Sequence, residues 1–117
     1  MKLIEIFEKV NLIAPIEQRK FFNFYNDTID ELNSLYGNLL FQKTEDGEEY
    51  EAPTKLDDEV LVLPLYQGAI IDNILFLVGK GEVYKSEFVR KARNAYLKYW
   101  NDNAKGRRLK KWGAFNV

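Results

Sequence analysis

Carboxylates are concentrated in one part of this chain. Eight of the eighteen acidic residues lie between Glu45 and Glu59. Carboxylate oxygens are the ligands that hard divalent cations prefer, but the cluster lacks the ligand spacing and the glycine position of a helix-loop-helix calcium loop. We therefore favour a solvated acidic face or an intermolecular contact over a metal site. The candidate residues are Glu48, Glu49, Glu51, Asp57, Asp58 and Glu59.

Basic residues gather near the end of the chain. Five of the seventeen lie between Lys105 and Lys111, and two aromatic residues follow them. Such a segment can bind phosphates or an acidic protein surface, or it can be a solvated tail without a partner. The two aromatics favour a partner, since a solubilising tail has little use for them. The candidate binding residues are Arg107, Arg108, Lys110, Lys111, Trp112 and Phe115.

The composition argues against catalysis. The chain has no cysteine and no histidine, so thiolate nucleophiles, the usual general base near neutral pH and the commonest transition-metal ligand are all missing. Gly79-Lys80-Gly81 does not have the phosphate-loop pattern and reads as a helix stop. Asp72 and Asn73 form a polar pair in an apolar segment, where a cap or an interface hydrogen bond is the favoured role. We expect no cofactor, no metal and no enzymatic activity.

Length and hydropathy bound the architecture. The 117 residues, 46% of them hydrophobic and 15% aromatic, suffice for one core. The apolar run over 69–78 is half the roughly 20 residues that a membrane-spanning helix needs, and the N-terminus lacks the apolar stretch of a signal peptide. We expect a soluble cytoplasmic chain with a helical domain over 1–103, an insertion at 38–63, and a basic C-terminal tail at 104–117.

The periodicity predicts the helices that must position these segments. A short amphipathic helix covers Met1 to Val10, and a second opens at Pro15 and ends at Gly37. Asp46-Gly47 indicates a hairpin inside the insertion, with a solvated loop as the alternative, and Val60 to Leu63 reads as a strand or an extended connector.

Two further helices follow the insertion. An apolar central helix runs from Pro64 to about Val78. The last helix begins between Glu82 and Ser86, and the tail follows Asn101-Asp102-Asn103. Trp100 and Trp112 are candidate interface anchors. One face of that helix carries Tyr84, Phe88, Ala92, Ala95, Tyr96 and Tyr99. The fold class is therefore mainly α: a three- to four-helix bundle with a hairpin or extended loop between the second and third helices and a mobile C-terminal tail.

Several of these segments resemble a known family. They are Pro64-Leu65-Tyr66, Ala69-Ile70-Ile71, the short glycine loop and the alanines and aromatics of the last helix, together with Phe22-Asn23, Asn26, Ile29 and Leu32 upstream. Over Gln18 to Tyr99 the chain is similar to the head-tail adaptors of tailed bacteriophages, also called connectors or head-completion proteins. The motifs consist of packing residues.

The resemblance implies a structural role. Such proteins assemble as a ring, often of twelve copies and from subunits that can be monomeric beforehand, beneath the portal protein after DNA packaging. The ring extends the channel for double-stranded DNA without reading its sequence, and it docks a tail or stopper protein. The implied location is the virion head-tail junction, after synthesis in the host cytoplasm, with no membrane involved.

A closed ring needs two different complementary faces on each subunit. The resemblance therefore assigns the acidic residues named above to an inter-subunit face. It assigns Arg107, Arg108, Lys110, Lys111, Trp112 and Phe115 to binding the portal or a neighbouring subunit.

Two other hypotheses of function remain. A small helical nucleic-acid-binding regulator would use the basic tail and the last helix, and its affinity would fall steeply with salt. The net charge of −1 argues mildly against this reading. The third reading is an interaction domain of a host bacterium.

Overall fold

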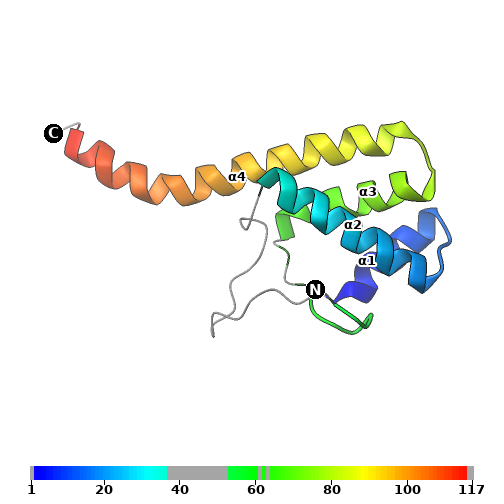
Figure 1. Ribbon diagram of the computed structural model, residues 1–117. Coiled ribbons are helices and arrows are strands. Elements are labelled where there is room, and N and C mark those ends of the chain that lie inside the picture. Colours follow the sequence, from blue (N-terminus) through cyan, green and yellow to red (C-terminus); the bar gives the residue numbers. More distant parts are fainter. Residues whose placement is uncertain (1, 37–52, 61, 63, 116–117) are drawn as a thin grey trace.

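The computed structural model describes residues 2–36, 53–60, 62 and 64–115, with side chains described only up to residue 101. Four α-helices follow one another, and a short 3-10 turn precedes the third (Figure 1). They are α1 (Leu3–Ile13), α2 (Gln18–Tyr36), the turn η2 (Pro64–Tyr66), α3 (Gln67–Val78) and α4 (Glu82–Phe115). The predicted mainly helical fold is confirmed.

The boundary between the first two helices differs from the prediction. α1 continues past Val10 to Ile13, and the N–H of Ala14 still donates to the Val10 carbonyl at 2.8 Å. The Asn11 side chain accepts a hydrogen bond from the Ile16 N–H at 3.1 Å and so orders the connection. Pro15 lies in this connection and does not open α2, which begins at Gln18. The asparagine that suggested a break instead bonds forward to the linker.

Glycine ends α3 as predicted. Gly79 adopts φ +100°, the left-handed conformation that a residue without a Cβ reaches without strain. Its N–H donates to the Phe76 carbonyl at 2.9 Å, and the Lys80 N–H donates to Leu75 at 3.1 Å. These bonds satisfy the last carbonyls of α3, so the chain can reverse into α4.

The segment before η2 packs against the start of α1. Leu3 N–H donates to the Asp58 carbonyl at 3.0 Å, and Ile4 N–H donates to Leu56 at 2.8 Å, beside an antiparallel bridge of Lys2 with Glu59. These bonds satisfy amides that a helix start leaves without intrahelical partners. Val60 is buried, as is Val62. Residues 53–60 form a connector with a turn at 55–58, where the Asp58 N–H donates to the Lys55 carbonyl at 3.1 Å. Residues 61 and 63 of the predicted strand or extended connector, and the predicted hairpin at 46–47, lie outside the described residues.

α3 is the central helix, as its apolar sequence predicted. It packs against α1, α2 and α4, and half of its twelve residues are buried. Because all four helices and the connector contribute to one core, burial of their apolar side chains stabilises a single unit. The largest fully buried side chains are Tyr25, Tyr66, Phe21, Phe88, Leu3, Ile6, Leu32, Ile70, Ile74, Leu75 and Val10.

α4 does not end where the sequence predicted. The helix continues through Asn101-Asp102-Asn103 to Phe115, which gives 34 residues and an axial length of about 51 Å. No proline interrupts this stretch, and its alanine, leucine, lysine and arginine residues favour helix strongly enough to outweigh Gly106 and the asparagines. The C-terminal part of α4 extends past the ends of α2 and α3 (Figure 1). The backbone of the predicted tail is therefore part of α4 up to Phe115.

Candidate functional site

A polar network joins three helices around Lys85 of α4. The Lys85 ammonium nitrogen lies 2.6 Å from Glu31 Oε1 of α2 and 3.1 Å from Asn73 Oδ1 of α3. The same nitrogen lies 4.7 Å from the centre of the Phe88 ring and 5.4 Å from that of Phe76. Carboxylate, amide and aromatic faces all favour a cation at this point.

The network continues from Asn73 into the interior. Asn73 is 1% exposed, and its Nδ2 donates to Thr28 Oγ1 at 2.9 Å. The Thr28 hydroxyl donates in turn to the Phe24 carbonyl at 2.8 Å. A buried amide with both ends satisfied specifies how α2, α3 and α4 fit together.

Asp72 points to a different partner. Its Oδ2 lies 2.6 Å from the Lys91 ammonium nitrogen of α4, and its side chain is only 11% exposed. Asp72 and Asn73 therefore both serve contacts between helices, and neither caps a helix end. The Asp72–Lys91 ion pair and the hydrogen bonds of Asn73 link α2, α3 and α4, and they stabilise the packing of these helices.

The acidic residues of the connector are not equivalent. Asp57 and Glu59 are exposed. Asp58 turns back on its own loop, where its carboxylate accepts the N–H groups of Thr54 at 2.9 Å and Lys55 at 3.0 Å. These backbone hydrogen bonds lower the pKa of Asp58, because they stabilise the charged form. The predicted acidic residues Glu48, Glu49 and Glu51 lie outside the described residues.

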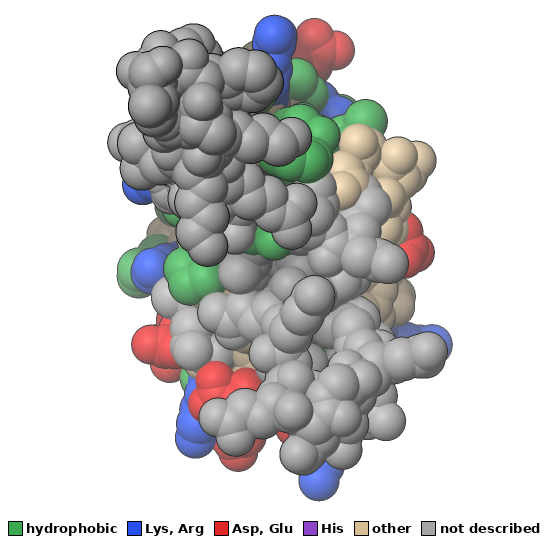
Figure 2. Space-filling model, turned by 90° about the vertical axis from the view of Figure 1, so that its left-hand side faces the viewer, with side chains coloured by type: hydrophobic (Ala, Val, Ile, Leu, Met, Phe, Trp, Pro, Cys, Tyr) green, Lys and Arg blue, Asp and Glu red, His purple; other side chains and the backbone are tan. Residues whose placement is uncertain are grey.

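The basic residues predicted to bind a partner lie on the projecting part of α4. The backbone of Arg107, Arg108, Lys110, Lys111, Trp112 and Phe115 is helical, while their side chains lie outside the described part. Figure 2 views the molecule from the end at which α4 projects, where charged side chains of both signs lie at the periphery with hydrophobic atoms among them. The backbone thus holds the basic segment beyond the bundle.

An aromatic cluster lies where α4 leaves the bundle. Tyr36 of α2 stacks on Tyr96 of α4 at a centroid distance of 4.8 Å, and Trp100 meets Tyr96 edge-on at 6.4 Å. The ring centres of Tyr66 of η2 and Tyr36 are 6.2 Å apart. Burial raises the pKa of Tyr66 to about 12. Trp100 is 48% exposed, so the predicted interface anchor is on the surface. Sequence reasoning missed Tyr36, whose position beside the α2 stop was the available signal.

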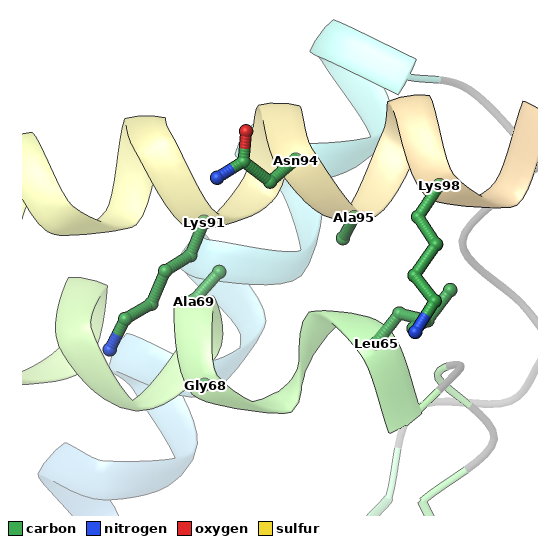
Figure 3. A pocket seen from close by; sticks show the side chains of 7 residues that line it. All are labelled: Leu65, Gly68, Ala69, Lys91, Asn94, Ala95 and Lys98. Atoms are coloured by element: carbon green, nitrogen blue, oxygen red, sulfur yellow. The ribbon is translucent and has the colours of Figure 1, made fainter.

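A shallow groove of about 220 Å³ lies between the start of α3 and the middle of α4 (Figure 3). Gly68 and Ala69 of α3 and Ala95 of α4 line it with little or no side chain, and Lys91 and Lys98 extend over its two ends (Figure 3). These small residues leave space between the two helices, which explains the groove. Since Lys91 is paired with Asp72, Lys98 is the more available cation.

A larger groove, which we call the end groove, lies where α3 ends against the α1–α2 connection. It encloses about 590 Å³, and its lining is mainly apolar: Ile16, Phe24, Leu77 and Val78, with Pro15, Glu17 and Lys20. Leu12 and Ile13 precede it on the chain and are 86% and 50% exposed. Sequence reasoning missed this surface, although an apolar Leu12-Ile13 pair next to a predicted helix break was visible.

Neither metal ligation nor membrane insertion is indicated by the described residues. Within them, no three Asp, Glu, His or Cys side chains gather as a metal site would require. No helix among the same residues is long and apolar enough to cross a bilayer. In comparisons with family models, curated proteins and solved structures, no match was found.

Proposed function

We propose that this protein is a non-enzymatic head-tail connector of a tailed bacteriophage. It assembles as a ring beneath the portal, extends the DNA channel and offers a docking surface to a tail or stopper protein. Its action is recognition between protein surfaces, so the residues that matter are those that it presents outside its own core.

The observation that carries this proposal is the shape of α4. The first part of the helix packs in the bundle through Phe88, Ala92 and Ala95, which are all buried. The same helix then continues past the bundle to Phe115 and takes the basic segment with it (Figure 1). The backbone of its last turns lies beyond the bundle, and isolated helical turns are marginal in water. Docking on another protein would stabilise these turns.

Charge separation supports assembly in one direction. The exposed Asp57 and Glu59 lie in the connector that pairs with α1, whereas residues 105–111 lie on the projecting end of α4. Rings form from head-to-tail contacts between unlike surfaces. An acidic and a basic surface at separate places on one subunit meet that requirement, and their attraction would favour the correct order.

One feature favours the nucleic-acid-binding regulator as a second candidate. Five of the seven residues at 105–111 are basic, and all seven lie on one helical backbone. This arrangement suits contacts with phosphates. This candidate requires affinity for DNA in the absence of any protein partner. The connector requires affinity for the portal ring.

The experiment that separates them is a binding assay with both partners. The purified protein is mixed with the portal ring of the phage that encodes it, or with a DNA duplex, at several salt concentrations. The connector predicts rings capping the portal in electron micrographs. Binding to duplex without portal, with an affinity that falls steeply with salt, would instead support the regulator.

A further inference from the structure

The end groove has the properties of a docking site for a hydrophobic protein segment. Its volume of about 590 Å³ falls within the range of ligand pockets, roughly 300–1,000 Å³. Leu77 and Val78 from the end of α3 and Phe24 from α2 contribute partly exposed apolar surface to it. Leu12 and Ile13, which precede the lining residue Pro15 in sequence, are also exposed. Soluble proteins rarely leave such adjoining apolar surface without a use.

The projecting end of α4 has matching chemistry. Its sequence carries Leu109, Trp112 and Phe115 at steps of three residues, the spacing at which residues neighbour one another along a helix. Trp is among the residues most enriched at interface hot spots, where it fills apolar pockets. Lys110 and Lys111 precede the tryptophan, and Glu17 at the lining of the end groove offers them a carboxylate.

The two features lie at opposite ends of one molecule. The α1–α2 connection and the end of α3 are at one end of the bundle, and the C-terminal end of α4 points away from the other (Figure 1). Because α4 is one continuous helix, its last turns cannot return to the end groove of the same chain without breaking. The segment that matches the groove is therefore available only from a second copy.

We propose that residues 109–115 of one copy dock in the end groove of the next copy. This inference rests on the proposed function, since it names the contact that would join neighbouring subunits of the ring. The contact is heterologous: each copy gives one helix end and receives another. Repetition of such a contact produces a closed ring or an open chain, according to the rotation between neighbours.

Cysteine crosslinking tests the contact directly, because the chain has no cysteine of its own. The full-length variant carrying Lys20→Cys and Ala114→Cys places one thiol in the groove lining and one in the docking segment, and it leaves the Glu17 carboxylate in place. Under mild oxidation it should form a ladder of disulfide-linked oligomers on a non-reducing gel. The matched control carries Ser34→Cys, at an exposed site of α2, with Ala114→Cys. It should stay almost wholly monomeric.

A complementation assay tests the direction of the contact. Leu77→Asp places a charge in the groove, and Trp112→Ala with Phe115→Ala removes the aromatic anchors from the docking segment. Each variant alone should sediment as a monomer while keeping the wild-type circular dichroism spectrum. An equal mixture should form a dimer and nothing larger, because only one functional groove and one functional segment can meet.

Either of two results would overturn the inference. One is the absence of a ladder from the Lys20→Cys, Ala114→Cys variant, or a ladder equally strong from the control. The other is a mixture of folded variants that stays monomeric. Rings that form on the portal without the ladder would retain the connector function and refute this contact. A disulfide ladder in a protein that does not bind the portal would support this contact and refute the connector function.

Discussion

Lys85 of α4 and Asn73 of α3 are joined by a hydrogen bond of 3.1 Å between the Lys85 ammonium and the Asn73 carbonyl oxygen. Asn73 is almost fully buried, whereas the Lys85 side chain is 31% exposed. The lysine therefore reaches from the surface to satisfy an interior amide, and its aliphatic stem covers apolar surface on the way. This arrangement fixes the register of α4 against α3, and so sets the direction in which the rest of α4 projects.

The first prediction concerns Lys85. Lys85→Met should lower the free energy of unfolding by about 1–3 kcal/mol, because the Asn73 oxygen loses its donor inside the protein. The partly exposed ion pair with Glu31 contributes less to that loss, since solvent screens it in part. Urea denaturation followed by circular dichroism measures the change. Lys80→Met, at the exposed α3–α4 turn, is the control and should leave the midpoint unchanged. Equal stability of the two variants would refute the role of Lys85.

The second prediction concerns the buried hydroxyl of Tyr66, which has no hydrogen-bond partner among the described residues. Tyr66→Phe should leave stability unchanged or raise it slightly at neutral pH, because it removes a buried polar group that has no partner. Tyr66→Ala should cost about 3–5 kcal/mol, because it leaves a cavity in the core. Thermal unfolding compares the two variants. A large loss in Tyr66→Phe would mean that the hydroxyl has a partner.

The same tyrosine gives a pH dependence. Its pKa is raised from 10.0 to about 12 in the folded protein, so the protonated form is favoured by folding. Its contribution to stability is fully present below pH 10 and is lost as the pH rises from 10 towards 12. Wild-type stability should therefore fall more steeply over this range than that of Tyr66→Phe. Parallel curves would contradict the assigned burial.

The third prediction compares two glycines. Gly79→Ala should lower stability by about 1 kcal/mol, because an alanine at φ +100° is strained. Gly68→Ala should raise it by up to about 1 kcal/mol, since position 68 is helical and the added methyl makes only an ordinary contact with Lys91. Chemical denaturation of both variants checks the opposite signs. A stabilised Gly79→Ala would show that the helix stop tolerates a side chain.

The fourth prediction concerns the connector loop. The Asp58 carboxylate holds the amides of Thr54 and Lys55, so Asp58→Ala should speed hydrogen exchange at both amides. Asp57→Ala, at an exposed neighbour, should not change them. Because the pKa of Asp58 is lowered, the protection is present at neutral pH and is lost as the pH falls through that lowered value. Unchanged exchange in Asp58→Ala would disprove this role.

Much of the fold was visible in the sequence because it depends on local signals. The helical spacing of Phe22, Tyr25, Ile29 and Leu32 predicted α2, although the structure buries Phe21 on this helix, and Gly79 marked the end of α3. Two boundaries were wrong for one physical reason. Asn11 in α1 and Asn101-Asp102-Asn103 in α4 are weak helix formers and were expected to mark helix boundaries, whereas each helix continues through them. Propensity is a weak signal where packing or neighbouring residues favour the helix.

The surfaces were harder to predict. The charged segments are contiguous in sequence and were found, but the end groove combines residues near positions 16 and 77, and no local pattern links them. Asp72 and Asn73 were recognised as a polar pair, yet their partners Lys91, Thr28 and Lys85 come from other helices. Such contacts require the packing of α2, α3 and α4 to be known first.

The most direct test of the proposed function is the mass of the complex formed with the portal ring, measured by native mass spectrometry. The proposed connector should bind in a defined number of copies per portal ring, with its own ring visible beneath the portal in electron micrographs. A variant with Arg107, Arg108, Lys110 and Lys111 replaced by Glu should lose this complex while keeping its helical circular dichroism spectrum. A wild-type protein that adds no mass to the portal would contradict the account.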